Sequence, residues 1–139
     1  MTERREFVCI GCPIGCPLQL THEGPNIVEV EGHECGRGAK YARQEFVDPR
    51  RSFSTTVVIH GARWVRLPVK VSRPVPKERI LEVAQLIHRL RVEAPVSVGQ
   101  VLLADVLGEP GIEVVASRSM PRVDCPRTGA SATPRGAVC

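Results

Sequence analysis

The sequence Cys9-Ile10-Gly11-Cys12-Pro13-Ile14-Gly15-Cys16 places three cysteines within eight residues, and a fourth, Cys35, follows after 18 intervening residues. An iron-sulfur cluster is held by several thiolates that converge on it, so the chain has to curl around the cluster. Glycine permits a tight curl because it lacks a Cβ atom, and proline stiffens the turns between the thiols. The spacing therefore predicts that Cys9, Cys12, Cys16 and Cys35 bind one [4Fe-4S] cluster.

Other interpretations of these cysteines stay open. Four thiolates also satisfy a tetrahedral zinc ion, although zinc ribbons usually pair two separated Cys-x2-Cys knuckles, which this spacing lacks. A set of redox-active thiols is a further alternative. His33 lies close enough to Cys35 to be an alternative ligand, whereas a solvated loop histidine is the simpler interpretation. Cys125 and Cys139 do not extend the ligand pattern, and we interpret them as unbound thiols.

The composition narrows the function classes. The net charge of +4 arises from 19 basic and 15 acidic residues spread along the chain, and aromatic residues make up only 4% of it. Nucleic-acid binding is therefore not predicted, because it usually relies on a concentrated basic surface and stacking aromatics. The first residues lack the apolar run of a secretory signal, and no stretch approaches the ~20 apolar residues that span a bilayer. We expect a cytoplasmic protein whose cysteines stay reduced and serve as metal ligands.

Hydrophobic periodicity predicts an α+β fold. In residues 1–50, strands over 18–22 and 27–31 pair as a hairpin that carries Cys35 back toward the other cysteines, and a short helix follows over 39–47. In residues 51–118, the predicted elements are strands over 54–60 and 64–71, a main helix over 76–91, and strands within 96–103 and over 112–116. We therefore expect a small iron-sulfur β-hairpin module (1–50), followed by a small sheet packed on one main helix (51–118).

The sequence after residue 50 also predicts where three features lie: a proline in a strand, two leucines of the main helix, and the last residues of the chain. Pro68 cannot donate to a sheet ladder, so its strand should lie at an edge or a bulge. On the main helix, Leu81 and Leu86 should widen the buried stripe that the other aliphatic residues form. Residues 119–139 hold few large aliphatic side chains, so we expect a tail that is disordered or ordered by a partner.

The cysteine pattern, followed by strand, turn and strand and then by Cys35-Gly36-Arg37-Gly38, resembles the N-terminal [4Fe-4S] module of the molybdopterin oxidoreductases. In that family the basic residue two positions after the last cysteine lies between cluster and pterin. The resemblance implies that Arg37 adjoins the cluster and tunes its potential. The sequence departs from that family after residue 50, because it lacks the large domains that hold the pterin, so molybdenum catalysis is not implied.

Over residues 1–118 the sequence more closely resembles a family of small bacterial and archaeal proteins of unassigned function. The matching segments are Cys9–Cys16, Cys35–Glu45, Asp48–Arg51, Pro74–Lys77, and Ala94–Val96 with Gly99. Members of that family are typically encoded with FAD-dependent dehydrogenases resembling anaerobic glycerol-3-phosphate dehydrogenase, and with pyridine-nucleotide-linked flavoproteins. The resemblance implies an electron-transfer subunit of such a dehydrogenase complex, which relays electrons between a flavin and another redox centre.

No catalytic residue is predicted, because the sequence lacks a dinucleotide-binding glycine fingerprint, a P-loop and an acid-base constellation. The main alternative function is a structural or assembly subunit in which zinc or a cluster only stabilises the N-terminal hairpin. A catalytic subunit in its own right is a third. Five basic residues near the last cysteine form a strip suited to an acidic partner or to a negative cluster, although solvation of a helix face also accounts for some of them: Arg37, Lys40, Arg43, Arg50 and Arg51.

Overall fold

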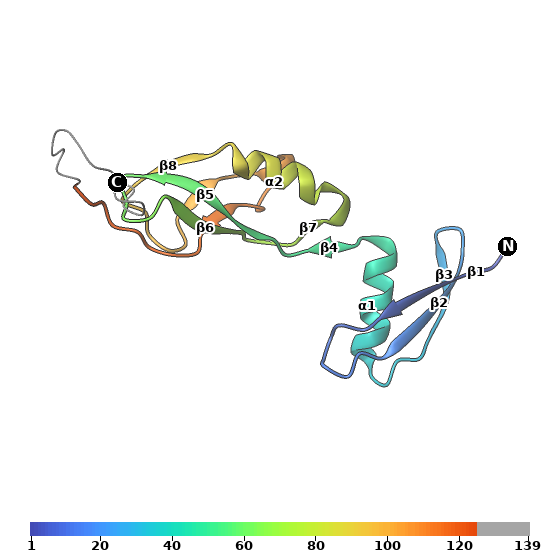
Figure 1. Ribbon diagram of the computed structural model, residues 1–139. Coiled ribbons are helices and arrows are strands. Elements are labelled where there is room, and N and C mark those ends of the chain that lie inside the picture. The colour runs from blue at the N-terminus through green and yellow to red at the C-terminus, as the bar shows by residue number, and fades with distance from the viewer. Residues whose placement is uncertain (125–139) are drawn as a thin grey trace, which may run out of the picture. The chain divides into compact units, whose positions relative to one another are not determined.

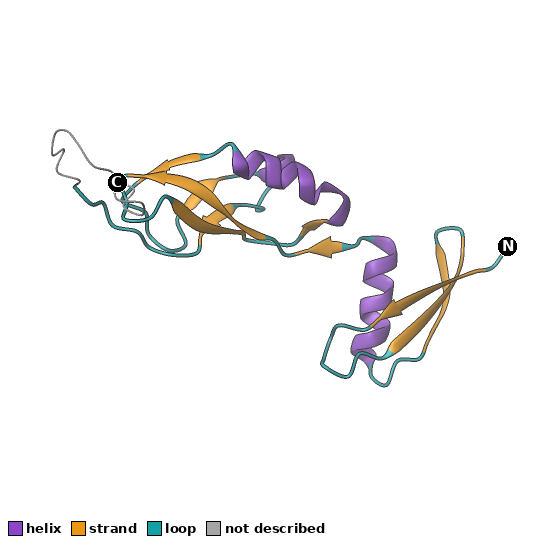
Figure 2. Ribbon diagram, in the orientation of Figure 1, coloured by secondary structure: helices purple, strands orange, loops and turns teal. Residues whose placement is uncertain are grey.

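The computed structural model describes residues 1–124 and divides into two compact units, Met1–Arg50 and Arg51–Cys139. Each unit combines strands with one α-helix (Figures 1 and 2). The predicted α+β class is confirmed. None of the helices in the described part of the chain is long and apolar enough to cross a lipid bilayer.

Unit 1 is a three-stranded antiparallel sheet with one helix on it. The strands β1 (Glu3–Val8), β2 (Pro17–Glu23) and β3 (Asn26–Glu31) are arranged in the order β1-β2-β3, and α1 spans Gly36–Val47. Side chains along β2 alternate between buried and exposed, as expected for a sheet with one covered face. The buried residues of this unit form one cluster: Cys9, Cys16, Leu18, Leu20, Val30, Ala39 and Ala42.

The helix α1 lies close to the sheet because its inner face is made of small residues. Gly38, Ala39 and Ala42 are its buried positions. A Cβ atom on Gly38 would lie 2.9 Å from the Cβ of His33 and 3.3 Å from a methyl carbon of Leu18. Any larger side chain at position 38 would push the start of the helix away from β2.

Unit 2 holds a five-stranded sheet in the order β8-β5-β6-β10-β9. Strand β5 pairs antiparallel with β6 and parallel with β8, and β10 pairs antiparallel with β6 and β9. The helix α2 packs on this sheet through Val83 and Ile87, which join the central core cluster with Val57 and Leu67. The elements of this part of the chain are β4 (Arg50–Arg51), β5 (Ser54–His60), β6 (Arg66–Val71), β7 (Val75–Pro76), the 3-10 helix η1 (Lys77–Arg79), α2 (Ile80–His88), β8 (Arg91–Glu93), β9 (Val101–Leu103), the 3-10 helix η2 (Val106–Gly108) and β10 (Val114–Ala116).

The main helix is shorter than the predicted range 76–91. Residues 77–79 form a 3-10 turn, and Arg91 already begins strand β8, which pairs in parallel with β5. Leu81 is 76% exposed, so its predicted place in the buried stripe is wrong. It lies too far around the helix from the stripe of Val83 and Ile87 to reach the sheet.

The prediction for Pro68 is also wrong, because β6 is the central strand of the sheet. The Pro68 carbonyl accepts a hydrogen bond of 2.9 Å from the Ser117 N–H, just beyond the end of β10. In extended backbone the nitrogen and the carbonyl of one residue point to the same side. The missing N–H therefore faces the chain after β10, where only one bond at the end of a ladder is lost.

The first residues of the expected tail, from 119 to 123, are attached to the core of unit 2. Met120 is only 4% exposed and forms an antiparallel bridge with Val96, with N–H to carbonyl distances of 2.9 and 2.8 Å. The Val123 N–H donates to the Gly61 carbonyl at 2.8 Å. One large apolar side chain is enough to attach this short segment to the core. The rest of the predicted tail, with Cys125 and Cys139, lies outside the described residues.

Gly32 provides a test of how the chain turns from β3 toward Cys35. Its φ angle is +81°, and a Cβ atom there would overlap the Pro17 carbonyl oxygen. We predict that Gly32→Ala lowers the free energy of unfolding by roughly 2–4 kcal/mol, the sum of the backbone cost and the overlap. Gly24→Ala is the matched control, because Gly24 also has positive φ (+57°) but nothing within 4 Å. If Gly32→Ala and Gly24→Ala lowered the melting temperature equally, the close approach of Gly32 to the Pro17 carbonyl oxygen would be contradicted.

A second prediction concerns Met120. Replacing this buried side chain by alanine should cost about 2–4 kcal/mol of stability, as large-to-small core substitutions do. Val98→Ala removes an exposed aliphatic side chain and should change stability by less than about 0.5 kcal/mol. Chemical denaturation of both variants measures the difference. A Met120→Ala variant as stable as wild type would contradict the attachment of residues 119–123 to the core through Met120.

Candidate metal centre

The four predicted ligands come from two segments of unit 1. Cys9, Cys12 and Cys16 lie in the loop that joins β1 to β2, and Cys35 immediately precedes α1. The loop and the start of α1 lie at the same end of this unit (Figure 1). The Arg37 side chain links the segments, since its Nη1 lies 3.5 Å from the Gly11 carbonyl oxygen.

The loop is closed at its base. The Cys9 N–H donates to the Cys16 carbonyl at 2.9 Å, one step beyond the last β1–β2 pair, Val8 with Pro17. Gly15 has a φ angle of +68°, which a residue with a side chain rarely adopts, so the return of the chain to β2 depends on this glycine. This closure places Cys9 and Cys16 in the core cluster of unit 1, whereas Cys12 is half-buried and Cys35 is exposed.

Arg37 and the Cys35 thiol shift each other's pKa. The Arg37 guanidinium beside Cys35 lowers the pKa of that thiol, and the backbone N–H groups of Arg37 and Gly38 at the start of α1 lower it further. In return the pKa of Arg37 is raised, first by Cys35 and to a smaller extent by Cys12 and Cys9. The N–H groups act through the helix N-terminus without a capping hydrogen bond of standard geometry.

The donor chemistry fits a thiolate-bound metal, although the sulfur atoms do not form a coordination shell. Among the described residues, no three His, Cys, Asp or Glu side chains are gathered closely enough to hold a metal ion. The potential donors in these two segments are soft thiols, which suit iron-sulfur clusters and zinc and do not suit magnesium or calcium. The predicted ligands therefore share one end of unit 1, and the ligand assignment itself stays a prediction.

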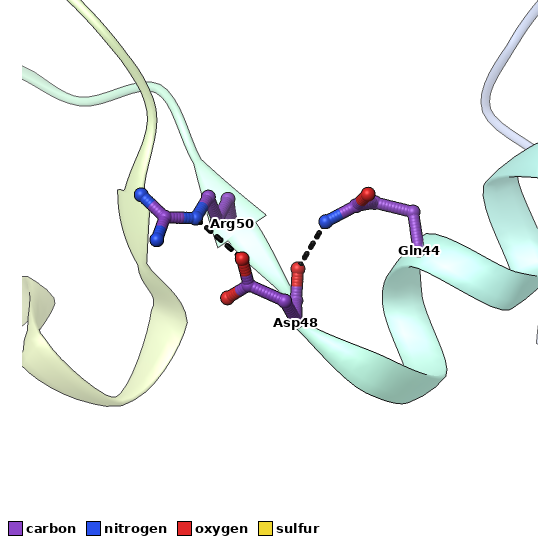
Figure 3. Close-up of polar contacts among 3 residues, drawn as sticks. All are labelled: Gln44, Asp48 and Arg50. Carbon is purple, nitrogen blue, oxygen red and sulfur yellow. Dashed lines mark hydrogen bonds and ion pairs between the residues drawn. The ribbon is translucent and has the colours of Figure 1, made fainter.

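The predicted basic strip does not act as one surface. The Arg50 Nε donates to a carboxylate oxygen of Asp48 at 2.6 Å, while the Gln44 side chain donates to the Asp48 carbonyl at 2.7 Å (Figure 3). The Asp48 N–H donates in turn to the Gln44 carbonyl at 2.9 Å. These bonds end α1 at the opposite end from Cys35. Arg50 thus fastens the helix terminus, and Arg51 also has an interaction partner.

Two features near the sheet were not identified from the sequence. Ile10 and Ile14, between the cysteines, are 70% and 69% exposed, and no periodic pattern marks loop residues as exposed or buried. His22 is buried, its ring centroid lies 4.5 Å from that of Phe46, and its Nδ1 donates to the Gly24 carbonyl at 2.9 Å. The alternation along β2 is the signal that places His22 on the inner face with Leu18 and Leu20.

A profile of the family described as "Protein of unknown function (DUF1667)" matches residues 36–118, which is more than half of the chain. The chain belongs to this family. The DUF1667 match includes α1 with Arg37 and most of unit 2, but it begins one residue after Cys35 and therefore does not cover the cysteines. No curated protein matches the chain.

One solved structure is similar over part of the chain. It is the NMR structure of Clostridium perfringens protein CPE0013, which is 19% identical. The similarity covers 60% of this chain and 98% of that one, with a TM-score of 0.48.

The contact between Arg37 and Cys35 predicts how the metal-free protein reacts with iodoacetamide. Arg37→Gln removes the main cause of the lowered thiol pKa, so less thiolate is present at neutral pH and Cys35 reacts more slowly. Peptide mass spectrometry after timed alkylation should show the Cys35 rate curve displaced to higher pH. Arg43→Gln, on the same helix but away from Cys35, is the control. Superimposable curves for Arg37→Gln and wild type would contradict the contact.

Proposed function

We propose that Cys9, Cys12, Cys16 and Cys35 bind one [4Fe-4S] cluster and that the chain is the electron-transfer subunit of a flavin-dependent dehydrogenase complex. The observation that carries the proposal is the meeting of two cysteine-bearing segments at one end of a small unit, where the Arg37 side chain lies beside Cys35 and reaches the Gly11 carbonyl oxygen of the loop. An electron carrier needs ligands, a tuned charge environment and one accessible side. In unit 1 the candidates for these three parts are the cysteine thiols, the Arg37 side chain and the exposed Cys35.

The protein residues have separate tasks in this proposal. When bound, a [4Fe-4S] cluster takes up and releases single electrons at a potential set by charge, hydrogen bonding and solvent exposure. Cys9 and Cys16 are buried with Leu18 and Ala39, so their side of the site is shielded from water. Cys12 and Cys35 are accessible to solvent. Arg37 holds a positive charge next to the thiolates and favours the more negative, reduced form.

The partner assignment rests on the family resemblance and not on the fold. It names a FAD-dependent dehydrogenase of a small hydroxylated metabolite, with glycerol 3-phosphate as the leading substrate, and a pyridine-nucleotide-linked flavoprotein as a second redox partner. In this scheme substrate oxidation takes place in the dehydrogenase. The chain itself binds no substrate and provides no catalytic residue.

A second candidate function is structural: a zinc ion or a cluster that only holds unit 1 together. The observation that favours it is the size of the core, because only seven buried hydrophobic residues hold this unit of 50 residues. Domains of this size often depend on a metal or a disulfide for stability. The two functions differ in whether electrons pass through the site.

Replacement of Cys12 separates these functions. We predict that Cys12→Ala in the complete complex removes or degrades the cluster and slows substrate-driven reduction of the acceptor at least tenfold, while Cys125→Ala leaves both unchanged. Iron and sulfide analysis and stopped-flow kinetics measure the two effects. Unchanged acceptor reduction in a complex shown to lack the cluster would favour the structural function. Iron loss in Cys125→Ala equal to that in Cys12→Ala would overturn the ligand assignment.

A further inference from the structure

The solvent-facing side of α1 carries an ordered set of exposed residues. The buried positions Gly38, Ala39 and Ala42 face the sheet, so residues spaced three, six, seven and ten positions along the helix from Arg37 share the opposite side. We call this side the helix face; its residues are Arg37, Lys40, Arg43, Gln44 and Val47, all of them exposed. It begins beside the cysteine loop, where Arg37 lies against Gly11.

The cations of the helix face lack compensating acids within the helix. The positions three and four residues from Lys40 hold only glycine, arginine and glutamine, and those around Arg43 hold only alanine, lysine, phenylalanine and valine. Arg37, Lys40 and Arg43 are therefore like-charged neighbours that repel one another. Among residues 1–124, neither Lys40 nor Arg43 forms an ion pair.

The acidic residue that adjoins the helix face, Asp48, is already engaged. A shallow hollow of about 420 Å³ lies along the second half of the helix face, lined by Lys40, Arg43, Gln44, Val47 and Asp48. The Asp48 carboxylate in this hollow is bound to Arg50 at 2.6 Å. The hollow therefore presents two unpaired cations and the apolar side chain of Val47, which is 70% exposed.

Helix stability does not explain this charge pattern. A helix is stabilised by acids in its first turn and by bases in its last turn, and α1 has neither. The Cys35 thiol accounts for Arg37. No described residue pairs with the positive charges of Lys40 and Arg43. Another molecule is therefore a source for their counter-charge.

We propose that the helix face is the docking surface for a carboxylate-rich surface of the FAD-dependent dehydrogenase, a proposal that rests on the proposed function. Acidic side chains on the partner supply the counter-charges that α1 lacks, and Val47 adds an apolar contact at the end of the row. A partner that covers the row from Val47 to Arg37 also reaches the cysteine loop, where Ile10 and Ile14 are exposed. Docking on this face therefore brings the partner to the electron-transfer site.

A second copy of the chain is the competing occupant. The outer face of the sheet in unit 1 carries three exposed acids and one exposed cation, so its net charge is opposite to that of the helix face: Glu6, Glu29, Glu31 and Arg4. Contact between these two different faces is head-to-tail, so it builds rings or open chains of copies and not a closed pair. Such assembly is visible in the isolated protein as a mass that grows with concentration.

Calorimetric titration of the full chain with the purified dehydrogenase tests the proposal. The double variant Lys40→Glu, Arg43→Glu should raise Kd at least tenfold at low salt and flatten the dependence of Kd on salt concentration. Lys70→Glu, Lys77→Glu changes the net charge equally at two exposed positions of unit 2, and its Kd should stay within about twofold of wild type. Lys40→Gln, Arg43→Gln should show a smaller increase, which guards against misfolding of the charge-reversed chain.

The outcomes are separable from those of the electron-transfer proposal. A Cys12→Ala chain that still binds the dehydrogenase but no longer transfers electrons leaves docking intact. Equal Kd values for the two charge-reversed variants, or no binding of the wild-type chain, would overturn the docking surface. So would light scattering that shows concentration-dependent self-association of wild type and its loss in Lys40→Glu, Arg43→Glu, since the occupant would then be a second copy.

Discussion

The hydrogen bond from the Cys9 N–H to the Cys16 carbonyl, 2.9 Å long, closes the loop that carries three of the four cysteines. It extends the ladder between β1 and β2, and β2 then buries Leu18 and Leu20 beneath α1. Because α1 starts directly after Cys35, the strand that closes the loop also positions the helix that follows the fourth cysteine. The site and the core of unit 1 therefore depend on the same pairing.

This coupling gives the candidate site two unlike sides. Cys9 and Cys16 share the core with aliphatic residues, so a change in the core also changes the surroundings of their thiols. Cys12 and Cys35 are on the accessible side with Arg37, whose positive charge, together with the helix N–H groups, lowers the pKa of the Cys35 thiol. The small core, the charged rim and the solvent-accessible side are compatible with the redox carrier that we propose, and the exposed cations of α1 continue that rim along the proposed docking surface.

The elements that can be predicted from the sequence are those with a local residue pattern, whereas elements that form only by pairing with a distant segment cannot. The hairpin of β2 and β3 is predictable from its alternating residues and its turn, and the cysteines and Arg37 stand out by spacing. Strand β1 cannot be predicted from its own residues, because they lack apolar alternation: Glu3, Arg4, Arg5 and Glu6. These residues become a strand through pairing with β2. Strand β8 at the end of α2 and the bridge between Val96 and Met120 cannot be predicted for the same reason, because both depend on pairing with a distant segment. Nor does spacing show that Asp48 engages Arg50 while Lys40 and Arg43 form no ion pair within residues 1–124.

Native mass spectrometry of the anaerobically purified full chain is the most direct measurement of the central claim, because it weighs the bound group and identifies its composition. The account predicts an excess over the polypeptide mass equal to about four irons and four sulfides, which disappears when all four cysteines Cys9, Cys12, Cys16 and Cys35 are replaced by serine. An excess equal to a single zinc ion would support the structural function in its place. A chain with the bare polypeptide mass, purified under conditions that preserve iron-sulfur clusters, would contradict the account.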